Sequence, residues 1–505
     1  MPDTLNFENG VPAQHFFNQG IGRTFDDLII LPAFNDGVTK DAINLQTKLG
    51  PLTLNIPILS SPMDTVTKAE MAIALALQGG LGFLHMNLTI PDAVTQVHQV
   101  KRYRMGIVTD PVCLSPDHKV SDAIAVKNRH NFSTVLITDN GLSNGTLLGM
   151  VIGKNVIMEE DPNRPLKEIM IPLNQLITAN DSEVTNWRQA QEFLRKHKRA
   201  EKVPIVRDDG TLAGFITDTD VEKMARCPHA LVDNETNQLL VGAAVSTHHR
   251  DDERVVELLN AKVDVLLVDC AQGGTSFAVK RIKQIRQLSD IPIIAGNVVT
   301  LSQAVPLIEA GADALRVGMG SGSICTTQLI AGIGRALLSA VYHVSHGLIR
   351  HGYRDIAVIA DGGIRYSSDI FKAFACGASC VMLGSMLAAC DESPAPVEMI
   401  GGRRFKKHRG MASPGAIREG GILRYGTELT RHTIIPQGVE GLVAAAGPVS
   451  RAINDLVESL RISFEDVGCA SLAQLHQKVD RSEVCFELYS PAAKKEGEPH
   501  DILQV

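Results

Sequence analysis

The chain has 505 residues, a formal net charge of −7, 44% hydrophobic residues and 21% charged residues. This length allows about three domains, and the composition excludes disorder, collagen and coiled coil as the main state. The acidic balance argues against nucleic acid as the default partner. No apolar run is long enough for a membrane span, so no membrane partner is expected. Nine cysteines without paired spacing and no signal-peptide core before Gly10 fit a reducing compartment, and we expect a cytoplasmic protein.

Eight short apolar runs, each followed by a small or polar residue and most by a helical stretch, form the main pattern. They are Ile58–Ser60, Leu81–His85, Val241–Val245, Val265–Val268, Ile291–Ala295, Ala314–Val317, Ile356–Ala360 and Cys380–Leu383. Continuous apolar runs are typical of strands buried on both faces of a parallel sheet. Helices are expected over 254–261, 277–288, 301–310 and 368–376. Eight βα units predict an α/β fold closed as a (β/α)8 TIM barrel, with a doubly wound open sheet as the alternative.

A long insertion separates the second run from the third, and it contains an internal repeat. Val135–Gly141 leads to Thr146–Ile152, and Val203–Gly210 leads to Thr211–Ile216, each an apolar hairpin followed by a helix. The pair resembles a tandem CBS (Bateman) domain over residues 109–228. This division leaves the barrel in two parts, residues 1–108 and 229–505.

The loop after the sixth run carries the strongest chemical signal. Its stretch Gly318–Thr327 alternates glycine and serine before Cys325. Exposed backbone N–H and C=O groups of such a loop can hold an anion or a cation. In a TIM barrel the reactive groups lie where strands end, and a thiolate there would be a nucleophile. The alternative is a glycine-rich turn with a buried cysteine.

Neighbouring strand ends predict a nucleotide site. Asp361–Gly363 follows the seventh run, where a carboxylate can accept two ribose hydroxyls and glycines allow close approach. Gly384–Ser385 follows the eighth run and suits a phosphate. Together they predict a nucleoside monophosphate across the last strands. The polar ends Asp269–Gly273 and Gly296–Thr300 indicate either a second ligand or residues that satisfy loop backbone. Residues 401–441, rich in Gly, Arg and Lys, are expected to be a surface loop or a mobile flap.

These segments, in this order, resemble the IMP dehydrogenases, in the superfamily that they share with the GMP reductases. The resemblance covers nearly the whole chain, and its anchors are Ser60–Thr67, Gly296–Thr300, Arg316–Thr327, Asp361–Gly363 and Arg409–Met411. It implies that Cys325 attacks C2 of IMP, that hydride passes to NAD, and that the covalent thioimidate is hydrolysed to XMP. Thr327 assists the water in this scheme. Arg424, beside Tyr425 on the flap, is the implied base.

The resemblance also implies binding roles. The expected substrate contacts are Ser61, Ser323, Gly363, Gly384, Ser385, Asp361, His408, Met411, Ala412 and Gln437. The expected cofactor contacts are Asp269, Cys270, Ala271, Asn297, Arg316, His248 and Phe277. A potassium ion is expected on backbone carbonyls of Gly320, Gly322 and Cys325, completed by the partner subunit's Glu496, Gly497 and Glu498. A homotetramer follows from the same resemblance, with octamers formed through the CBS modules.

Several positions depart from the family pattern. His408 replaces a tyrosine beside the phosphate, Ala412 replaces a glycine near the base, and Cys270–Ala271 replaces a pair of serines. These changes leave substrate discrimination open. A GMP reductase would use Cys325 to displace ammonia from GMP with hydride from NADPH. Arg424 and Tyr425 favour the dehydrogenase. A nucleotide-sensing protein with an inert barrel is a third alternative.

The two CBS copies differ in the residues at the position where such modules bind a nucleotide. The second has Thr217 and Asp220 in the Thr-x-x-Asp pattern by which such modules hold a ribose and a phosphate. The first has Gly153–Val156 at the equivalent place, without the acid. We therefore expect the second copy to bind a purine nucleotide. A purely structural pair is the alternative.

Overall fold

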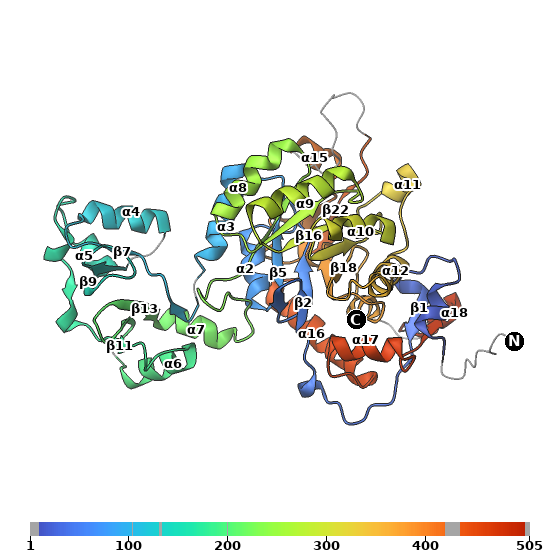
Figure 1. Cartoon of the computed structure of the whole chain (residues 1–505), viewed down its shortest axis with the longest axis horizontal. Helices are drawn as coiled ribbons and strands as arrows, with labels where there is room; N and C mark the ends of the chain where they lie inside the picture. The colour runs from blue at the N-terminus through green and yellow to red at the C-terminus, as the bar shows by residue number, and fades with distance from the viewer. Residues whose placement is uncertain (1–9, 104, 131–133, 199, 420–434, 500–505) are drawn as a thin grey trace. The chain divides into compact units, whose positions relative to one another are not determined.

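The computed structural model describes residues 10–103, 105–130, 134–198, 200–419 and 435–499. The chain forms two compact units, Met1–Val100 together with Leu240–Val505, and Lys101–Leu239. Figure 1 draws the second unit in cyan and green. Over the described ranges, no helix combines the length and the apolar character needed to cross a bilayer.

The first unit is built on a closed barrel of eight parallel strands, in the order β14-β15-β16-β17-β18-β19-β4-β5. The strands are β4 (Ile58–Ser60), β5 (Leu81–Leu84), β14 (Gly242–Val245), β15 (Val265–Asp269), β16 (Ile293–Val298), β17 (Ala314–Val317), β18 (Ala357–Asp361) and β19 (Cys380–Leu383). The predicted TIM barrel is confirmed. The open sheet is excluded because β5 pairs with both β4 and β14.

Helices surround the barrel on its outside (Figure 1). They are α2 (Ala69–Leu77), α3 (Ile90–Lys101), α8 (Asp252–Asn260), α9 (Ser276–Leu288), α10 (Leu301–Glu309), α12 (Leu337–Arg350) and α13 (Ser367–Ala375). Two short helices lie on loops after strands: α11 (Thr327–Ala331), which has no buried residue, after β17, and α14 (Ser385–Ala388) after β19. The four predicted helices agree with α8, α9, α10 and α13 to within two residues. In α9 the buried positions are 278, 281, 282 and 285, the three-to-four spacing of one helix face.

Strand β16 extends further than its apolar run predicts. It ends at Val298, so the polar Asn297 belongs to the strand end. Gly296 stands opposite Asp269 of β15 and Arg316 of β17 in the ladder. Apolar periodicity does not detect this extension because Gly296 and Asn297 interrupt the apolar run before Val298.

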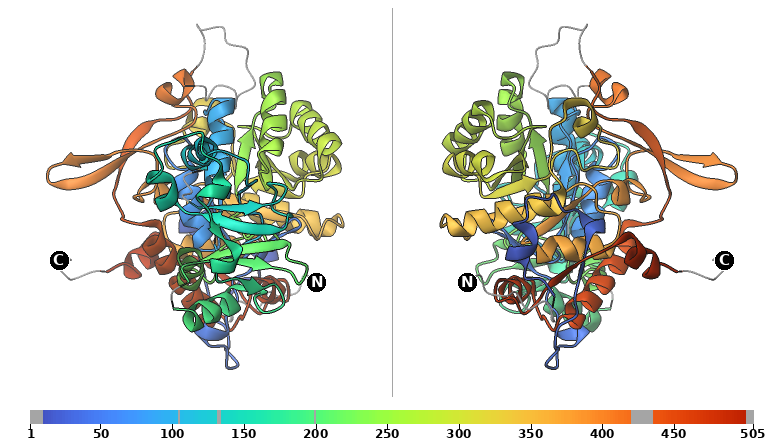
Figure 2. Two further views of the ribbon diagram at one scale, coloured as in Figure 1. Left: turned by 90° about the vertical axis from the view of Figure 1, so that its left-hand side faces the viewer. Right: turned by 90° about the vertical axis from the view of Figure 1, so that its right-hand side faces the viewer.

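Residues 401–441 are not simply a loop. Within them, β21 (Arg403–Arg409) pairs with β20 (Val397–Ile400) and β22 (Glu440–Ala444), and α15 (Pro414–Arg418) lies between. Figure 2 shows this sheet extending away from the barrel. The surface-loop alternative is therefore wrong for Arg403–Arg409, which form β21, whereas the flap alternative stays a prediction. Arg424 and Tyr425, on which the flap prediction rests, lie outside the described residues.

The cause of this error is a buried lysine. Lys406 is 1% exposed although its neighbours Arg403 and Arg404 are exposed. Its Nζ donates to the backbone carbonyls of Cys390, Asp391 and Ser393 at 2.7, 2.9 and 3.0 Å. Three acceptors compensate the ammonium for its loss of water. Buried and exposed positions therefore do alternate along β21, but several of these positions hold cationic residues, so the hydrophobic pattern does not reveal the strand.

The remaining elements of this unit lie near the two chain ends. They are α1 (Ala13–Phe17), β1 (Leu28–Ile30), β2 (Thr47–Leu49), β3 (Leu52–Leu54), α16 (Val449–Asp466), α17 (Leu472–Asp480), β23 (Phe486–Leu488) and α18 (Pro491–Glu496). Strand β1 pairs antiparallel with β23. This pairing joins the N-terminal and C-terminal segments of the unit.

The second unit consists of two four-stranded sheets, ordered β10-β9-β8-β7 and β11-β12-β13-β6. Its strands are β6 (Ile107–Val108), β7 (Cys113–Leu114), β8 (Val135–Thr138), β9 (Leu147–Val151), β10 (Ile171–Pro172), β11 (Ala179–Asn180), β12 (Lys202–Val206) and β13 (Leu212–Thr217). Its helices are α4 (Val120–His130), α5 (Gly153–Ile157), α6 (Trp187–Lys196) and α7 (Asp218–Arg226). In each sheet a central hairpin has one parallel and one antiparallel neighbour. The two halves therefore share one strand arrangement.

Candidate active site

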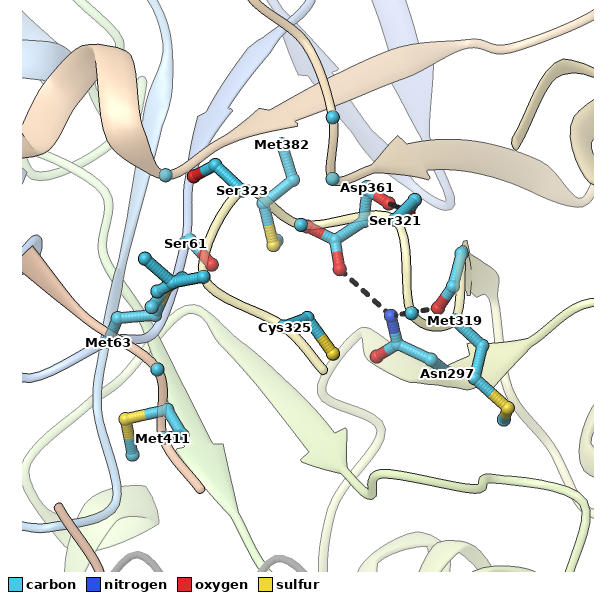
Figure 3. A pocket seen from close by; sticks show the side chains of 18 of the residues that line it. Ser61, Met63, Asn297, Met319, Ser321, Ser323, Cys325, Asp361, Met382 and Met411 are labelled. Carbon is cyan, nitrogen blue, oxygen red and sulfur yellow. Dashed lines mark hydrogen bonds between the residues drawn. The ribbon is translucent and has the colours of Figure 1, made fainter. Parts of the chain in front are cut away.

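A cavity opens at the carboxyl ends of the barrel strands. Its walls come from the loops after β4, β15, β16, β17, β18 and β19, together with residues 408, 410–412 and 437. Figure 3 shows side chains from these segments converging on one space. This is the face on which TIM barrels carry reactive groups.

The loop that carries Cys325 is shaped by glycines and tied to a second segment. Gly320 has φ of +76°, which a residue with a side chain rarely adopts. Cys325 forms an antiparallel bridge with Gly438, and the Thr326 N–H donates to the Gln437 carbonyl at 3.0 Å. The Cys325 thiol is thereby presented to the cavity on a backbone held from both sides.

Cys325 is half-buried and is not the buried structural cysteine of the alternative reading. Figure 3 places it in the space between Met411 and Asn297. Its Sγ lies 3.1 Å from the Thr327 hydroxyl. A hydroxyl at this distance can donate a hydrogen bond to a thiolate, the nucleophilic form of the side chain.

Asp361 at the end of β18 is held by a buried charge network. Its Oδ2 accepts from Arg316 Nε at 3.0 Å and from Asn297 Nδ2 at 2.8 Å. Arg316 Nη1 also pairs with Asp269 Oδ1 at 2.8 Å. No described residue donates to Asp361 Oδ1, so this oxygen is available to hydroxyl groups of a ligand.

The opposite wall combines close backbone with a buried imidazole. Gly363 has φ of +70°, and a side chain there would meet the Ser321 carbonyl at 2.9 Å. His408 Nδ1 lies 3.2 Å from the Thr65 hydroxyl. Burial lowers the pKa of His408 to about 4, because a charged imidazole would lose its water. His408 is therefore neutral near pH 7.

The cavity collects most of the residues singled out in the sequence. All ten expected substrate residues line it: Ser61, Ser323, Asp361, Gly363, Gly384, Ser385, His408, Met411, Ala412 and Gln437. Cys325 and Thr327 line it as well, with Asp269, Ala271, Asn297, Arg316, Gly320 and Gly322. Lining places these side chains together, and their individual roles stay predictions.

Other expected residues do not line the cavity. Cys270 is buried, and its backbone exchanges hydrogen bonds of 2.8 Å with Gly296 and Asn297. His248 begins the short helix η5 (His249–Asp251) after β14, and Phe277 lies in the first turn of α9 with 69% exposure. The expected ion ligands Glu496–Glu498 lie at the end of α18 and the turn after it.

Four methionines and two isoleucines supply apolar walls, and only Met411 among them is predicted as a site residue from the sequence. The others are Met63, Met319, Met382, Ile324 and Ile364. Met382 belongs to an apolar strand run, so nothing in the sequence distinguishes it from the core. Apolar walls with a few polar groups are typical of sites for planar ligands. This site combines a thiol, a carboxylate, small residues and apolar walls, which together can bind a nucleotide and attack its base.

Comparisons with known proteins agree with this geometry. The family model of the IMP dehydrogenase / GMP reductase domain matches residues 22–500. The chain is 40% identical over 483 residues to inosine-5'-monophosphate dehydrogenase of Halalkalibacterium halodurans, covering 95% of this chain and 96% of that protein. It is 40% identical over 493 residues to the enzyme of that name from Schizosaccharomyces pombe, covering 96% and 92%.

A solved structure is similar over the same length. It is a cysteine-to-alanine variant of GMP reductase from Trypanosoma brucei in complex with guanosine 5'-monophosphate. The TM-score is 0.80 at 32% identity, covering 97% of this chain and 100% of that one. Both coverage and identity are well above what a shared fold alone would give. The chain belongs to the IMP dehydrogenase / GMP reductase family.

Proposed function

We propose that the protein oxidises IMP to XMP with NAD, a step in guanine nucleotide synthesis. The observation that carries this proposal is the Cys325 thiol, half-buried beside the Thr327 hydroxyl in the same cavity as Asp361 and Gly384. Relatives named IMP dehydrogenase at about 40% identity support the substrate.

The cavity residues orient the substrate. The free Oδ1 of Asp361 accepts the ribose hydroxyls, while Arg316 and Asn297 fix this carboxylate on its other oxygen. Backbone around Gly363 and Gly384 and the hydroxyls of Ser61, Ser323 and Ser385 hold the phosphate. Met411, Ala412 and Gln437 face the base. This pose brings C2 of the purine next to Cys325.

The reaction then has two stages. The Cys325 thiolate forms a bond to C2 of IMP, and C2 loses a hydride with its electron pair, leaving a thioimidate. NAD supplies the oxidising chemistry by accepting that hydride beside Asp269, Ala271, Asn297 and Arg316. Water then adds to C2 and loses a proton, and the sulfur departs as thiolate to release XMP. Thr327 assists the water, and Arg424, with Tyr425 beside it, is the expected base.

The competing function is reduction of GMP to IMP and ammonia with NADPH. It is favoured by the similarity to the Trypanosoma brucei enzyme, whose structure holds guanosine 5'-monophosphate. The same thiol would attack C2 of GMP, and ammonia would leave in place of the hydride. An inert nucleotide sensor would retain binding without either reaction.

An absorbance assay at 340 nm separates these functions. A rise with IMP and NAD that is lost in Cys325→Ala supports the dehydrogenase. A fall with GMP and NADPH supports the reductase. No change with either pair, together with IMP binding measured by calorimetry, indicates the inert sensor. Cys227→Ala, in the second unit, is the matched control.

Potassium and assembly complete the proposal. Backbone carbonyls are ligands of the kind that alkali cations take, and the loop from Gly320 to Cys325 offers several. The partner subunit's Glu496, Gly497 and Glu498 would complete the ion site in a homotetramer, which can pair into octamers. Faster turnover in KCl than in NaCl at equal ionic strength is expected. The proposed compartment is the cytoplasm.

The second unit is proposed to be a CBS pair that binds a purine nucleotide. A cavity in it is lined by residues of both halves, among them Thr134 and Leu136 from one half and Phe215, Thr217 and Asp220 from the other. Asp220 accepts from the Thr217 hydroxyl at 2.8 Å and pairs with Lys223 at 2.9 Å. These bonds orient the carboxylate that a ribose would meet.

Calorimetry with ATP, GTP and GMP tests this second proposal. Binding that weakens at least tenfold in Asp220→Ala supports it. Equal binding by wild type and variant, or none, favours a purely structural pair. Asp208→Ala, an exposed acid of the same unit, is the control.

A further inference from the structure

Arg281 on α9 is a buried cation that the proposed chemistry does not use. Its side chain is 3% exposed, and its Nε has no partner among the described residues. Burying a guanidinium is costly unless its donors are satisfied. Its two other nitrogens both have partners, and these compensate part of the cost of burial.

These two nitrogens join α9 to the segment after β14. Arg281 Nη2 donates to the backbone carbonyl of His248 at 2.8 Å. Nη1 pairs with Asp252 at the start of α8 at 2.7 Å. One side chain thus holds both ends of the short turn that begins at His248.

The same turn is secured from its inner side. Ser246 N–H donates to Asp251 Oδ2 at 2.6 Å, and Arg254 Nε donates to Asp251 Oδ1 at 3.1 Å. The His248 backbone N–H donates to the Ser246 hydroxyl at 3.2 Å. These bonds fix the turn to β14 and α8, whereas Arg281 alone among them comes from α9.

Phe277 lies one helical turn before Arg281, about 6 Å along the axis of α9 and on nearly the same side. Its ring is 69% exposed, and the His248 ring stands 4.2 Å from that of His249. The exposed Phe277 ring and the half-buried His248 ring follow two neighbouring strands, and such a pair is suited to a planar base. The bond from Arg281 to the His248 carbonyl ties the residue that carries one ring to the helix that carries the other.

We propose that Arg281 is a positioning residue that holds His248 against α9, so that His248 and Phe277 bind the adenosine half of the dinucleotide. The inference rests on the proposed function, and it takes from the family resemblance the expectation that His248 and Phe277 contact the NAD cofactor. Arg281 touches neither substrate nor dinucleotide. It contributes affinity by removing the freedom of the turn before binding.

The test compares NAD with nicotinamide mononucleotide, which carries the reactive ring but no adenosine. In Arg281→Met we expect KM for NAD to rise at least tenfold. KM for nicotinamide mononucleotide and for IMP stays within twofold, and kcat within threefold. Arg281→Lys restores part of the loss, since one ammonium cannot bond both partners in the same geometry. Circular dichroism checks that each variant is folded.

Arg286→Met is the matched control. Arg286 lies on the same helix, pairs with Asp313 and donates to the Gly311 carbonyl, at the end of the helix away from His248. It should leave the ratio of the two KM values unchanged. If Arg281→Met raised KM for NAD and KM for nicotinamide mononucleotide by the same factor, or raised neither, the inference would be overturned.

A binding measurement separates this inference from the proposed function. Calorimetry with ADP-ribose needs no turnover, and its dissociation constant should rise at least tenfold in Arg281→Met but not in Arg286→Met. Absence of NADH formation by the wild type would contradict the proposed function alone. Unchanged ADP-ribose binding in Arg281→Met would contradict the inference alone.

Discussion

The two carboxylate oxygens of Asp361 have different surroundings. Oδ2 accepts from Arg316 and Asn297, so the carboxylate is fixed before any ligand arrives. Oδ1 remains for hydroxyl groups. A fixed acceptor binds without losing side-chain freedom, which is the physical advantage of this arrangement.

Asp361→Asn should raise KM for IMP at least tenfold and lower kcat less. The amide removes the charge that pairs with Arg316 and offers a weaker acceptor to the ribose. Steady-state kinetics at saturating NAD measures this split. Asp355→Asn, an exposed acid before the same strand, should change neither constant. An unchanged KM in Asp361→Asn would remove the ribose role.

Two buried histidines, His85 and His408, make the free energy of unfolding depend on pH on the acid side. Burial lowers the pKa of each imidazole to about 4, below the 6.5 of an exposed one. The unfolded chain therefore binds more protons than the folded chain between pH 6.5 and pH 4. Their stabilising effect is complete above pH 6.5 and is lost as the pH falls toward 4.

His85→Phe should reduce the acid sensitivity. Between pH 7.5 and pH 5, the free energy of unfolding should fall by about 2 kcal/mol less than in wild type. Denaturant unfolding at both pH values measures the difference. His15→Gln, at an exposed histidine, should match wild type. An equal fall in His85→Phe and wild type would show that His85 does not titrate in this range.

At the scale of elements, an ion pair joins the loop after β4 to the stretch that carries the proposed base contacts. Arg409 at the end of β21 donates to Asp64 Oδ2 at 2.7 Å and to Glu419 at 2.5 Å. The Asp64 and Glu419 carboxylates raise the pKa of Arg409, so it stays charged. His408, Met411 and Ala412 lie beside this anchor.

Asp64→Asn should destabilise the protein by about 3–5 kcal/mol, because it leaves a buried guanidinium with less compensation. KM for IMP should rise as the stretch after Arg409 loosens. Thermal unfolding and steady-state kinetics measure the two effects. Asp391→Asn removes a largely exposed pair with Arg404 and should cost under about 1 kcal/mol. If both variants lost the same amount of stability, the ion pair between Arg409 and Asp64 would not be an anchor.

At the scale of the whole molecule, the described residues that line the cavity all belong to the first unit. Each of these residues belongs to the segments on either side of Lys101–Leu239. The ends of the inserted unit also meet, since Lys101 Nζ donates to the Leu239 carbonyl at 3.2 Å. The barrel can therefore close without the insertion.

Replacing residues 103–237 by a short Gly-Ser linker should leave kcat for IMP and NAD within threefold. Any effect of purine nucleotides on the rate should disappear, because Thr217 and Asp220 are removed. Kinetics with and without ATP or GTP measures both. A folded variant with more than a tenfold lower kcat would show that the insertion supports catalysis.

The sequence alone predicts the barrel because each buried strand must be a continuous apolar run. It also predicts the Cys325 loop, since glycines and serines before a cysteine at a strand end have few structural uses. It misses β21, whose alternating burial involves cationic residues, and it ends β16 too early, because Gly296 and Asn297 interrupt the apolar run. Met63, Met319 and Met382 are missed as cavity walls because methionine is common in cores.

Local pattern along the chain determined which residues stand at strand ends, and in what order, because periodicity and glycine spacing are properties of neighbours in sequence. Closure of the barrel decided that Asp269, Arg316 and Asp361 share one charge network, and packing of β21 against the loop after β4 decided that His408 is neutral. Ion pairing and desolvation depend on distances through space, which residues far apart in the sequence acquire only when the chain folds.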